Sequence, residues 1–394
     1  MLNEKQEREL AYVVAINWIK PIEGADNIEL VGINGWTCIA KKGEFKEGDK
    51  AVYFEIDSKL PETEWSEFLA AKHYKVKTMK LSKFGVISQG LALPFNAFGW
   101  DADKHEVGDF LTKELNVTYS VEEDNKRKAN STGDKYKKMA QRHPDVFKKP
   151  FVKWLYKRNW GKKLLFVFFG KKRDKVGWPA WVVKTDEERV QNMPWILENK
   201  DEWIATEKID GTSTTFTLKK GKGKKKDYFV CSRNVVFDTP EKADRCFYES
   251  NVYLEMSEKY NMQNVLEGLM NENSNIDFVT IQGETYGKTI QKREYGLKDH
   301  DLMVFNLIFG FKDGTTVRLN PIEMTEYLKP YGVPCVPIVD SAFILPDTVE
   351  ELLTIATGKS AVDGGMREGL VFRSLDGQRS FKAVSNEFLL KYHQ

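Results

Sequence analysis

One strongly basic segment divides this sequence and limits how the chain can be organised. Residues 126–178 contain 18 Lys or Arg residues and three acidic residues, a net charge of +15. The whole chain of 394 residues has a net charge of only +2, so the remainder is acidic. A chain of this length suggests two or three domains, and the sequence changes character on both sides of the segment. A cationic block on an acidic body indicates a polyanionic partner, nucleic acid or an anionic membrane; the simpler alternative is a solvated linker.

The two flanks of this segment have different patterns. Short β-rich runs separated by Gly, Pro and Asp fill residues 10–115, which predicts a small barrel or sandwich. The sequence after residue 180 is typical of an α+β domain. It predicts a β-hairpin in residues 205–234, a helical stretch in residues 241–273, and further strands in residues 277–287, 301–311, 315–320, 368–374 and 378–385.

The basic segment also contains many aromatic residues. A helical interpretation of residues 151–158 brings Phe151, Trp154, Leu155 and Arg158 near one face. The cations could grip phosphates while Trp154, Tyr156 and Trp160 stack on bases or pack against a neighbour.

The cysteines and the apolar runs indicate in which cellular compartment the protein is expected. Four cysteines occur with no C-x-x-C pair, which excludes a zinc ribbon and a disulfide scaffold and fits a reducing compartment. The polar N-terminus does not resemble a signal peptide, and the longest apolar run, residues 164–169, is too short to span a bilayer. We therefore expect a soluble, intracellular (cytoplasmic) protein without a membrane partner.

Several catalytic motifs are missing. The run GETYGKT, residues 283–289, resembles a phosphate-binding loop but has three residues instead of four between its glycines. The sequence has no G-x-S-x-G, H-E-x-x-H or dinucleotide fingerprint, and its five histidines do not cluster. Triad or histidine-based metal chemistry is therefore not expected.

The positive signal is Lys208-Ile209-Asp210-Gly211, which follows a short β run. A lysine attacks phosphorus only as the free amine, so burial, nearby cations or a metal must lower its pKa from about 10.4. The product of such an attack is a phosphoramidate. Asp210 and Gly211 would form the turn that aims the amine.

Residues further along the chain supply what nucleotidyl transfer needs. Glu284 and Glu368 can hold a hydrated Mg²⁺, which prefers oxygen ligands. Arg233 and Lys382 can neutralise phosphate charge, and Phe305 can stack on a purine. Each residue also has an ordinary structural interpretation, but the whole set in this order favours a catalytic site.

With these motifs, the sequence resembles the covalent nucleotidyltransferases, which include ATP-dependent DNA and RNA ligases and mRNA-capping guanylyltransferases. It is most similar to the RNA ligases that carry an OB-fold domain before the catalytic domain. The runs IKPIEGADNIEL, KKGEFKEGD, EIDSKLP and GVISQGLALP resemble that N-terminal domain. WPAWVVKTDEERVQN resembles the entry into the catalytic domain, and REGLVFR and SFKAVSNEFLLK resemble its last two motifs.

The resemblance implies a role for each matching residue. Lys208 would be the nucleophile that becomes linked to AMP, Glu207 would contact the adenine edge and Phe305 would stack on the base. Arg233 would hold the ribose or a substrate phosphate. Further implied roles belong to Glu284 (ribose or metal-bound water), Glu368 (metal), Asp210 (metal, through water), Lys382 (α-phosphate) and Arg189 (β- and γ-phosphates or the lysyl-AMP state). The last motif is often K-x-K but stands here as Ser380-Phe381-Lys382, so Arg379 could replace the missing cation, or Lys382 could act alone.

The resemblance gives a complete prediction of fold and function. It implies an α+β fold with antiparallel sheets: an OB-type domain in residues 1–118, a basic and partly helical linker in residues 119–178, and a nucleotidyltransferase domain in residues 179–394. The implied activity is an ATP-dependent RNA ligase that joins 3′-hydroxyl and 5′-phosphate ends, such as those of a nicked duplex, through lysyl-AMP, with Mg²⁺ or Mn²⁺. Residues 1 to about 180 contain no group assigned to the ATP site. The oligomeric state is not predicted.

Two alternatives stay open at this stage. Within the superfamily, the chain could be a DNA ligase or a GTP-using capping enzyme, although the N-terminal position of the small β domain argues against both. Outside enzymes, it could be a nucleic-acid-binding protein with a decayed transferase domain, against which the intact set of Lys208, Glu284, Glu368 and Lys382 argues.

Overall fold

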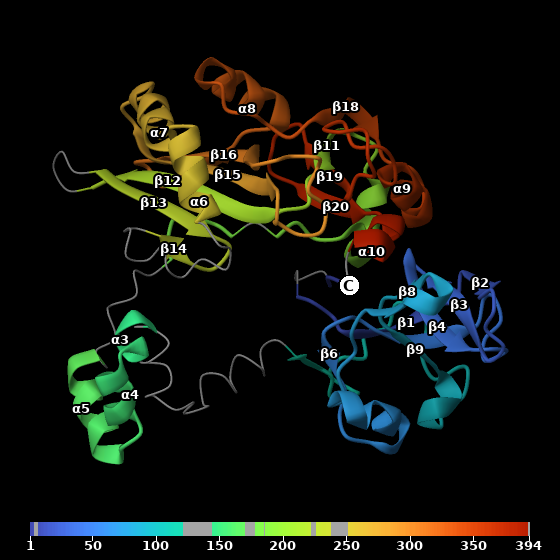
Figure 1. Cartoon of the computed structure of the whole chain (residues 1–394). Coiled ribbons are helices and arrows are strands. Elements are labelled where there is room, and N and C mark those ends of the chain that lie inside the picture. The colour runs from blue at the N-terminus through green and yellow to red at the C-terminus, as the bar shows by residue number, and fades with distance from the viewer. Residues whose placement is uncertain are drawn as a thin grey trace.

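The protein is represented by a computed structural model, which describes residues 1–3, 7–120, 144–169, 178–184, 186–221, 226–237 and 251–392 (Figure 1). Ten strands precede the first described α-helix, strands and helices are mixed after it, and the strands of each sheet pair antiparallel. The predicted α+β fold with antiparallel sheets is confirmed. The predicted domain boundaries at residues 118 and 178 stay predictions.

The N-terminal domain contains two three-stranded sheets, in the orders β1-β5-β9 and β2-β3-β4. Alternate residues of its central strands enter two cores: Val13 and Val52 belong to one, and Tyr12 and Tyr53 to the other. The strands of this domain are β1 (Ala11–Ala15), β2 (Trp18–Pro21), β3 (Ile28–Ile33), β4 (Trp36–Lys41), β5 (Lys50–Phe54), β6 (Ser58–Lys59), β7 (Met79–Leu81), β8 (Val86–Ser88), β9 (Leu91–Pro94) and β10 (Thr118–Tyr119).

Three helices occupy the described part of the basic segment: α3 (Pro144–Lys148), α4 (Pro150–Tyr156) and α5 (Asn159–Phe169). Leu155 of α4 and Leu165 of α5 form a small core between them. Phe151, Trp154 and Arg158, which the sequence groups with Leu155, are exposed. The predicted face is therefore divided, with Leu155 inside and the other three side chains outside. Figure 1 shows the three helices as a group apart from both domains.

The C-terminal domain is built on two larger sheets. One has six strands in the order β14-β13-β12-β15-β16-β17, and the other has four in the order β18-β11-β19-β20. Their strands are β11 (Glu202–Lys208), β12 (Thr212–Lys220), β13 (Lys226–Ser232), β14 (Val236–Phe237), β15 (Ile276–Gly287), β16 (His300–Phe311), β17 (Thr316–Arg318), β18 (Ile338–Ile344), β19 (Gly369–Ser374) and β20 (Ser380–Val384). The helices of this domain are α6 (Val252–Lys259), α7 (Met262–Asn271), α8 (Pro321–Leu328), α9 (Val349–Ala356) and α10 (Asn386–Tyr392).

Helices α6, α7 and α8 cover one face of the six-stranded sheet (Figure 1). The described part of the helical stretch predicted for residues 241–273 is two helices, because Asn261, the N-cap residue just before α7, has a left-handed φ of 47°. Residues 241–250 lie outside the described residues. The opposite face of this sheet is rich in buried polar side chains, among them Thr217, Thr280 and Gln282. Helix α9 packs on the four-stranded sheet and closes a second core.

The turn between β3 and β4 joins the N-terminal domain to the C-terminal domain. The Gly35 N–H donates a hydrogen bond of 2.9 Å to Glu350 of α9, and Gln191 donates one of 3.5 Å to the Gly35 carbonyl. Gly35 has φ +78°, and a Cβ atom there would lie 2.3 Å from a methyl carbon of Val349. Both the backbone conformation and the closeness of α9 therefore require glycine at this turn.

Replacing Gly35 with alanine is expected to undock the N-terminal domain. Gly43 is the matched control, because it has φ +77° but nothing within 4 Å of its Cβ position. Gly35→Ala and Gly43→Ala should each lower the free energy of unfolding by about 1–2 kcal/mol, because alanine is strained in the left-handed backbone conformation. Only Gly35→Ala should also increase the radius of gyration measured by small-angle scattering. Equal scattering curves for the two variants would contradict this assignment of the interface.

Candidate active site

A cavity of about 370 Å³ is lined by residues of both large sheets. All eight residues that the sequence analysis assigns to nucleotide binding line it: Arg189, Glu207, Lys208, Arg233, Glu284, Phe305, Glu368 and Lys382. Gly211 also lines the cavity. Side chains separated by up to 193 positions in the sequence thus share one hollow, which supports the interpretation of the motifs as one site.

Lys208 lies at the end of β11, where this strand pairs with the start of β19. The register places Lys208 opposite Gly369, so the preceding residue, Glu368, lies beside it. Lys208 Nζ donates a hydrogen bond of 2.8 Å to Glu368 Oε2. Burial by itself would lower the pKa of Lys208, but the carboxylates of Glu368 and Glu284 outweigh it and raise the pKa above its usual value. The expectation of a lowered pKa is therefore wrong for the protein without ligand, in which Lys208 is an ammonium ion.

Glu284 lies on β15 opposite Ser213 of β12, just beyond the turn that contains Gly211. A Cβ atom on Gly211 would lie 2.3 Å from the Thr285 carbonyl oxygen, so this close approach requires glycine. Burial, together with the nearby Glu368 and Asp210, raises the pKa of Glu284 to about 8 although Lys208 opposes the shift. Asp210 is buried, its N–H donates to the Tyr295 hydroxyl at 2.8 Å, and its side chain does not line the cavity.

Two carboxylates of the cavity, Glu284 and Glu368, are the candidate ligands for a metal ion. Among the described residues, no group of three or more His, Cys, Asp or Glu side chains is arranged to hold a metal ion. Glu284 and Glu368 both line the cavity next to Lys208, and oxygen ligands suit Mg²⁺ and Mn²⁺. Two carboxylates fit an ion that keeps most of its water ligands.

Two residues line the part of the cavity expected to hold the base. Phe305 lies in a β-bulge of β16, because Gln282 pairs with Asn306 and Gly283 pairs with Val304, which leaves Phe305 without a partner in this register. Bulges redirect side chains next to active sites. The buried carboxylate of Glu207 accepts hydrogen bonds from the Ser360 hydroxyl at 2.5 Å and the Ala361 N–H at 2.7 Å, so the 360–361 loop fixes its orientation.

The cations that could hold phosphates are paired with an acid that the sequence analysis missed. Asp186 forms an ion pair of 2.5 Å with Arg233 and accepts a hydrogen bond of 3.4 Å from Lys382. The same motif run, TDEER, supplies Asp186, Glu187 and Arg189, so the signal was present in the sequence. Burial lowers the pKa of Lys382, and the Lys208 ammonium adds to the effect.

Arg189 is the most enclosed of these cations, and the N-terminal domain contributes to its enclosure. Its guanidinium carbon lies 5.6 Å from the ring centre of Trp36. Burial lowers the pKa of Arg189. In the described part of the chain, no hydrogen-bond partner reaches its Nη1 atom. A buried donor without a partner fits an anionic ligand. Sequence reasoning missed Trp36, which is distant in sequence and matches no nucleotide-binding motif.

Arg379 does not lie in the cavity. It stacks over Trp203 at 5.3 Å and lies 3.8 Å from Asp201. Ser380, which stands where the motif often has its first lysine, donates a hydrogen bond to Glu187. Lys382 is the cation of this motif that lines the cavity.

A buried ionic cluster, also missed from the sequence, lies behind the cavity. Arg373 of β19 is 3% exposed and donates to the Phe305 carbonyl at 3.0 Å and to Asn306 at 2.5 Å. Its other nitrogen donates to Glu187 at 3.3 Å. Burial and the neighbouring Arg318 lower the pKa of Arg373 to about 10. The cluster of Arg373, Glu187 and Asn306 thus joins β19 to β16 and to the entry segment.

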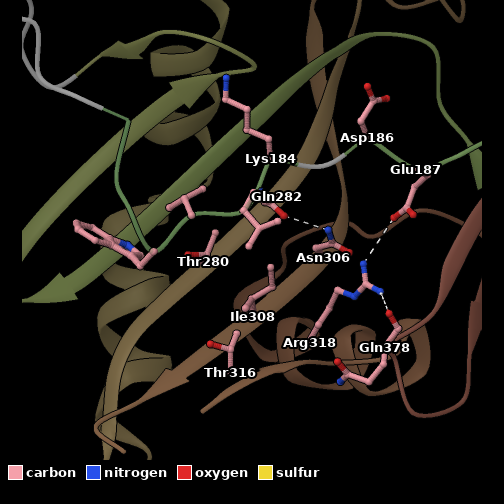
Figure 2. Close-up of a pocket in the computed structure, with 13 residues that line it drawn as sticks. Lys184, Asp186, Glu187, Thr280, Gln282, Asn306, Ile308, Thr316, Arg318 and Gln378 are labelled. Carbon is pink, nitrogen blue, oxygen red and sulfur yellow. Dashed lines mark hydrogen bonds and ion pairs between the residues drawn. The ribbon is translucent and has the colours of Figure 1, made fainter. Parts of the chain in front are cut away.

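A second cavity, of about 410 Å³, lies on the other side of Glu187 (Figure 2). Figure 2 shows Gln282 and Asn306 at its floor, joined by a hydrogen bond of 3.0 Å, with Lys184 and Arg318 beside them. Arg318 donates to the backbone of Gln378 at 2.7 Å and reaches Glu187 at 3.7 Å. The polar groups of its floor are thus largely paired with each other.

Comparisons with known proteins agree with this geometry. The sequence model of an OB-fold domain matches residues 10–95, and that of the RNA ligase family matches residues 201–393. Naegleria gruberi RNA ligase, in a lysine-to-alanine variant with ATP and Mn, is 30% identical and has a TM-score of 0.64 over 98% of this chain and 99% of that chain. The same ligase with pyrophosphate is 30% identical and has a TM-score of 0.62 over 98% of this chain and 99% of that chain. No curated protein sequence matches the chain.

These matches confirm the predicted N-terminal OB-fold domain followed by an α+β catalytic domain. No helix in the described residues combines the length and the apolar character that crossing a membrane requires. Cys38 and Cys335 are free thiols.

Breaking the buried cluster should destabilise the protein more than breaking an exposed ion pair. Arg373→Met is expected to cost about 3–5 kcal/mol because it leaves Glu187 without its buried partner. Combined with Glu187→Gln, the losses should be less than additive, since both substitutions remove one interaction. The measurement is the free energy of unfolding in urea.

The matched control is Arg379→Met, three residues before Lys382, where the exposed pair with Asp201 should contribute at most about 1 kcal/mol to the free energy of unfolding. Fully additive losses for Glu187 and Arg373, or equal losses for Arg373 and Arg379, would show that the cluster does not hold the domain together.

Proposed function

The chain belongs to the RNA ligase family, and we propose that it joins a 3′-hydroxyl end of RNA to a 5′-phosphate end through a lysyl-AMP intermediate. The observation that carries this proposal is the pairing of Lys208 with Glu368 inside a cavity lined by all eight residues assigned to nucleotide binding. The similar Naegleria ligase has been solved with ATP and Mn and with AMP and Mn, which supports ATP as the substrate and a divalent metal as the cofactor.

In the first step, Lys208 Nζ attacks the α-phosphorus of ATP. A nitrogen–phosphorus bond forms, the bond from this phosphorus to the bridging oxygen breaks, and pyrophosphate leaves with that electron pair. The amine must first lose a proton, and Glu368 Oε2, 2.8 Å from Nζ, is the acceptor that we propose. Glu284 and Glu368 would hold the divalent ion, which when bound supplies positive charge against the phosphates.

The remaining groups bind and orient ATP. Phe305 would stack on the adenine and Glu207 would accept a hydrogen bond from its amino group, since this carboxylate is already fixed by Ser360 and Ala361. Arg189 would direct its unpartnered nitrogen to the phosphates. Arg233 and Lys382 would exchange Asp186 for phosphate oxygens. Positioning and charge stabilisation account for most of the catalysis in such phosphoryl transfers.

The two later steps use the same cavity. An oxygen of the RNA 5′-phosphate attacks the AMP phosphorus, the nitrogen–phosphorus bond to Lys208 breaks, and an adenylylated 5′ end forms. The 3′-hydroxyl oxygen then gives up its proton to solvent and attacks the phosphorus of the RNA end. The new phosphodiester bond forms, the bond from this phosphorus to the bridging oxygen breaks, and AMP leaves with that electron pair. We propose nicked duplexes as the substrate to test first, with RNA or DNA on each side of the nick.

Lys208→Ala and Lys208→Arg should both abolish transfer of label from α-labelled ATP to the denatured protein. Arginine keeps the charge but cannot be deprotonated to attack. The matched control is Lys288→Arg, an exposed lysine, which should label normally. Labelling of Lys208→Arg would move the nucleophile elsewhere. Labelling by GTP in place of ATP would indicate a capping enzyme, and no labelling of the wild-type protein would indicate a binding protein.

Glu284→Ala and Glu368→Ala should each lower the rate of lysyl-AMP formation by about 10²–10³-fold, because each removes a group that stabilises charge in the transition state. Their circular dichroism spectra should match the wild type. Glu326→Ala, at an exposed position on α8, is the control and should keep the wild-type rate. Near wild-type rates for both cavity variants would refute the assignment of the carboxylates.

A further inference from the structure

Helices α4 and α5 present a row of aromatic side chains to solvent. Phe151, Trp154 and Trp160 are 69%, 46% and 56% exposed. The rings of Phe151 and Trp154 stack with centres 5.9 Å apart and planes 15° apart, and Trp160 meets Trp154 edge-on at 6.3 Å. The helices form their own core on the other side, around Leu155 and Leu165. These rings are therefore not needed to hold the helices together.

A cation lies on the same face as the rings. Phe151 and Trp154 are three residues apart in α4, which brings them to one side of the helix, and Arg158, two residues past the end of α4, lies over Trp154. The Arg158 guanidinium lies 3.8 Å from the centre of the Trp154 ring, and one of its nitrogens donates to the Trp154 carbonyl at 3.3 Å. Residues 144–169 contain seven Lys or Arg residues and one acidic residue, so the whole helical group is strongly cationic.

This arrangement distinguishes between two polyanionic partners. A helix that lies in a bilayer surface separates its apolar side chains from its cations. A single-stranded nucleic acid offers bases and phosphates side by side, and the proteins that bind it combine aromatic rings with cations on one surface. Arg158 over the Trp154 ring, beside the stacked ring of Phe151, matches the second case. The apolar stripe of Leu164, Val167 and Phe168 further along α5 is the feature that a bilayer would also fit.

We infer that Phe151, Trp154, Arg158 and Trp160 form a binding surface for a single-stranded segment of the RNA substrate. Unpaired bases stack on the exposed rings, and Arg158 and the surrounding lysines contact the phosphates. Base-paired RNA keeps its bases stacked inside the helix, so this surface selects single-stranded regions next to the ends to be joined. The inference rests on the proposed function, because RNA as the occupant follows from the ligase activity.

The test measures RNA binding by the full chain separately from catalysis. The probe is a labelled single-stranded RNA of about 20 nucleotides, longer than the roughly 4–16 nucleotides that one single-strand-binding module covers, and fluorescence anisotropy reports its affinity. Phe151→Ala combined with Trp154→Ala should weaken binding by about 5- to 150-fold for each base that loses its ring. Arg158→Gln should reduce the slope of log affinity against log salt by about 0.7.

Two controls separate stacking from general loss of apolar surface. Phe68→Ala removes a ring that is 59% exposed in the N-terminal domain. Leu164→Ala combined with Val167→Ala trims aliphatic side chains of α5. Both should bind the probe like the wild type. Blunt nicked duplex without single-stranded tails should bind the Phe151 and Trp154 variant like the wild type too.

The outcomes separate this inference from the proposed function. Lysyl-AMP formation by the Phe151 and Trp154 variant should equal that of the wild type, since these residues do not line the cavity. Absence of lysyl-AMP in the wild type would refute the proposed function without altering the RNA-binding result. Unchanged RNA affinity in the variant would overturn the inference. The second probe is a vesicle of phosphatidylcholine and phosphatidylserine. If the variant keeps its RNA affinity but no longer floats with vesicles that the wild type binds, the bilayer is the occupant.

Discussion

The active-site cavity depends on one buried charge, the guanidinium of Arg373. This side chain is almost completely enclosed, yet it carries three hydrogen bonds that end on two different structural units. One unit is β16, which carries Phe305 and Asn306, and the other is the entry segment, which carries Glu187. A buried charge is costly unless it is paired and hydrogen-bonded, so the arrangement holds only when all of these segments are in place. Phe305 on β16 and Arg189 in the entry segment are therefore held in place only when the two large sheets are packed together.

The cavity without ligand is a set of internally paired charges. Lys208 is held by Glu368, and Arg233 and Lys382 are both held by Asp186. Each of these cations has a role in phosphate chemistry in the proposed mechanism, in which ATP binding would exchange their carboxylate partners for phosphate oxygens. Such an exchange would cost less than bringing bare charges together, because the cations are already oriented by their partners and two of them, Lys208 and Lys382, are also largely buried. The raised pKa of Lys208, caused by the carboxylates of Glu368 and Glu284, belongs to this arrangement without ligand.

The sequence allowed the members of the site to be predicted, because each stands in a short motif whose local geometry is fixed. Lys208 ends a strand before a tight turn at Gly211, and Glu368 begins the strand that pairs with it. The direction of the Lys208 pKa shift was missed, since it depends on carboxylates that approach only through the fold, one of them 160 residues away. Arg373 was missed for the same reason, as nothing in its neighbourhood of the sequence indicates that it reaches Glu187. The break at Asn261 was missed because helical periodicity continues on both sides of one left-handed residue.

The docking of the N-terminal domain adds a dependence that the motifs alone do not contain. Trp36 begins β4, directly after the turn at Gly35 that contacts α9 and Gln191. The same turn therefore both fixes the domain and brings the indole ring against Arg189. Removing this ring would admit water to a guanidinium that is otherwise buried, and water weakens each electrostatic interaction that the guanidinium makes. The sequence analysis assigns no residue before 180 to the ATP site. In the proposed mechanism the N-terminal domain still contributes no reacting group, but its Trp36 sets the environment of Arg189, a cation that binds the phosphates. In the proposed mechanism, formation of lysyl-AMP is therefore coupled to domain docking through the packing of Trp36 on Arg189.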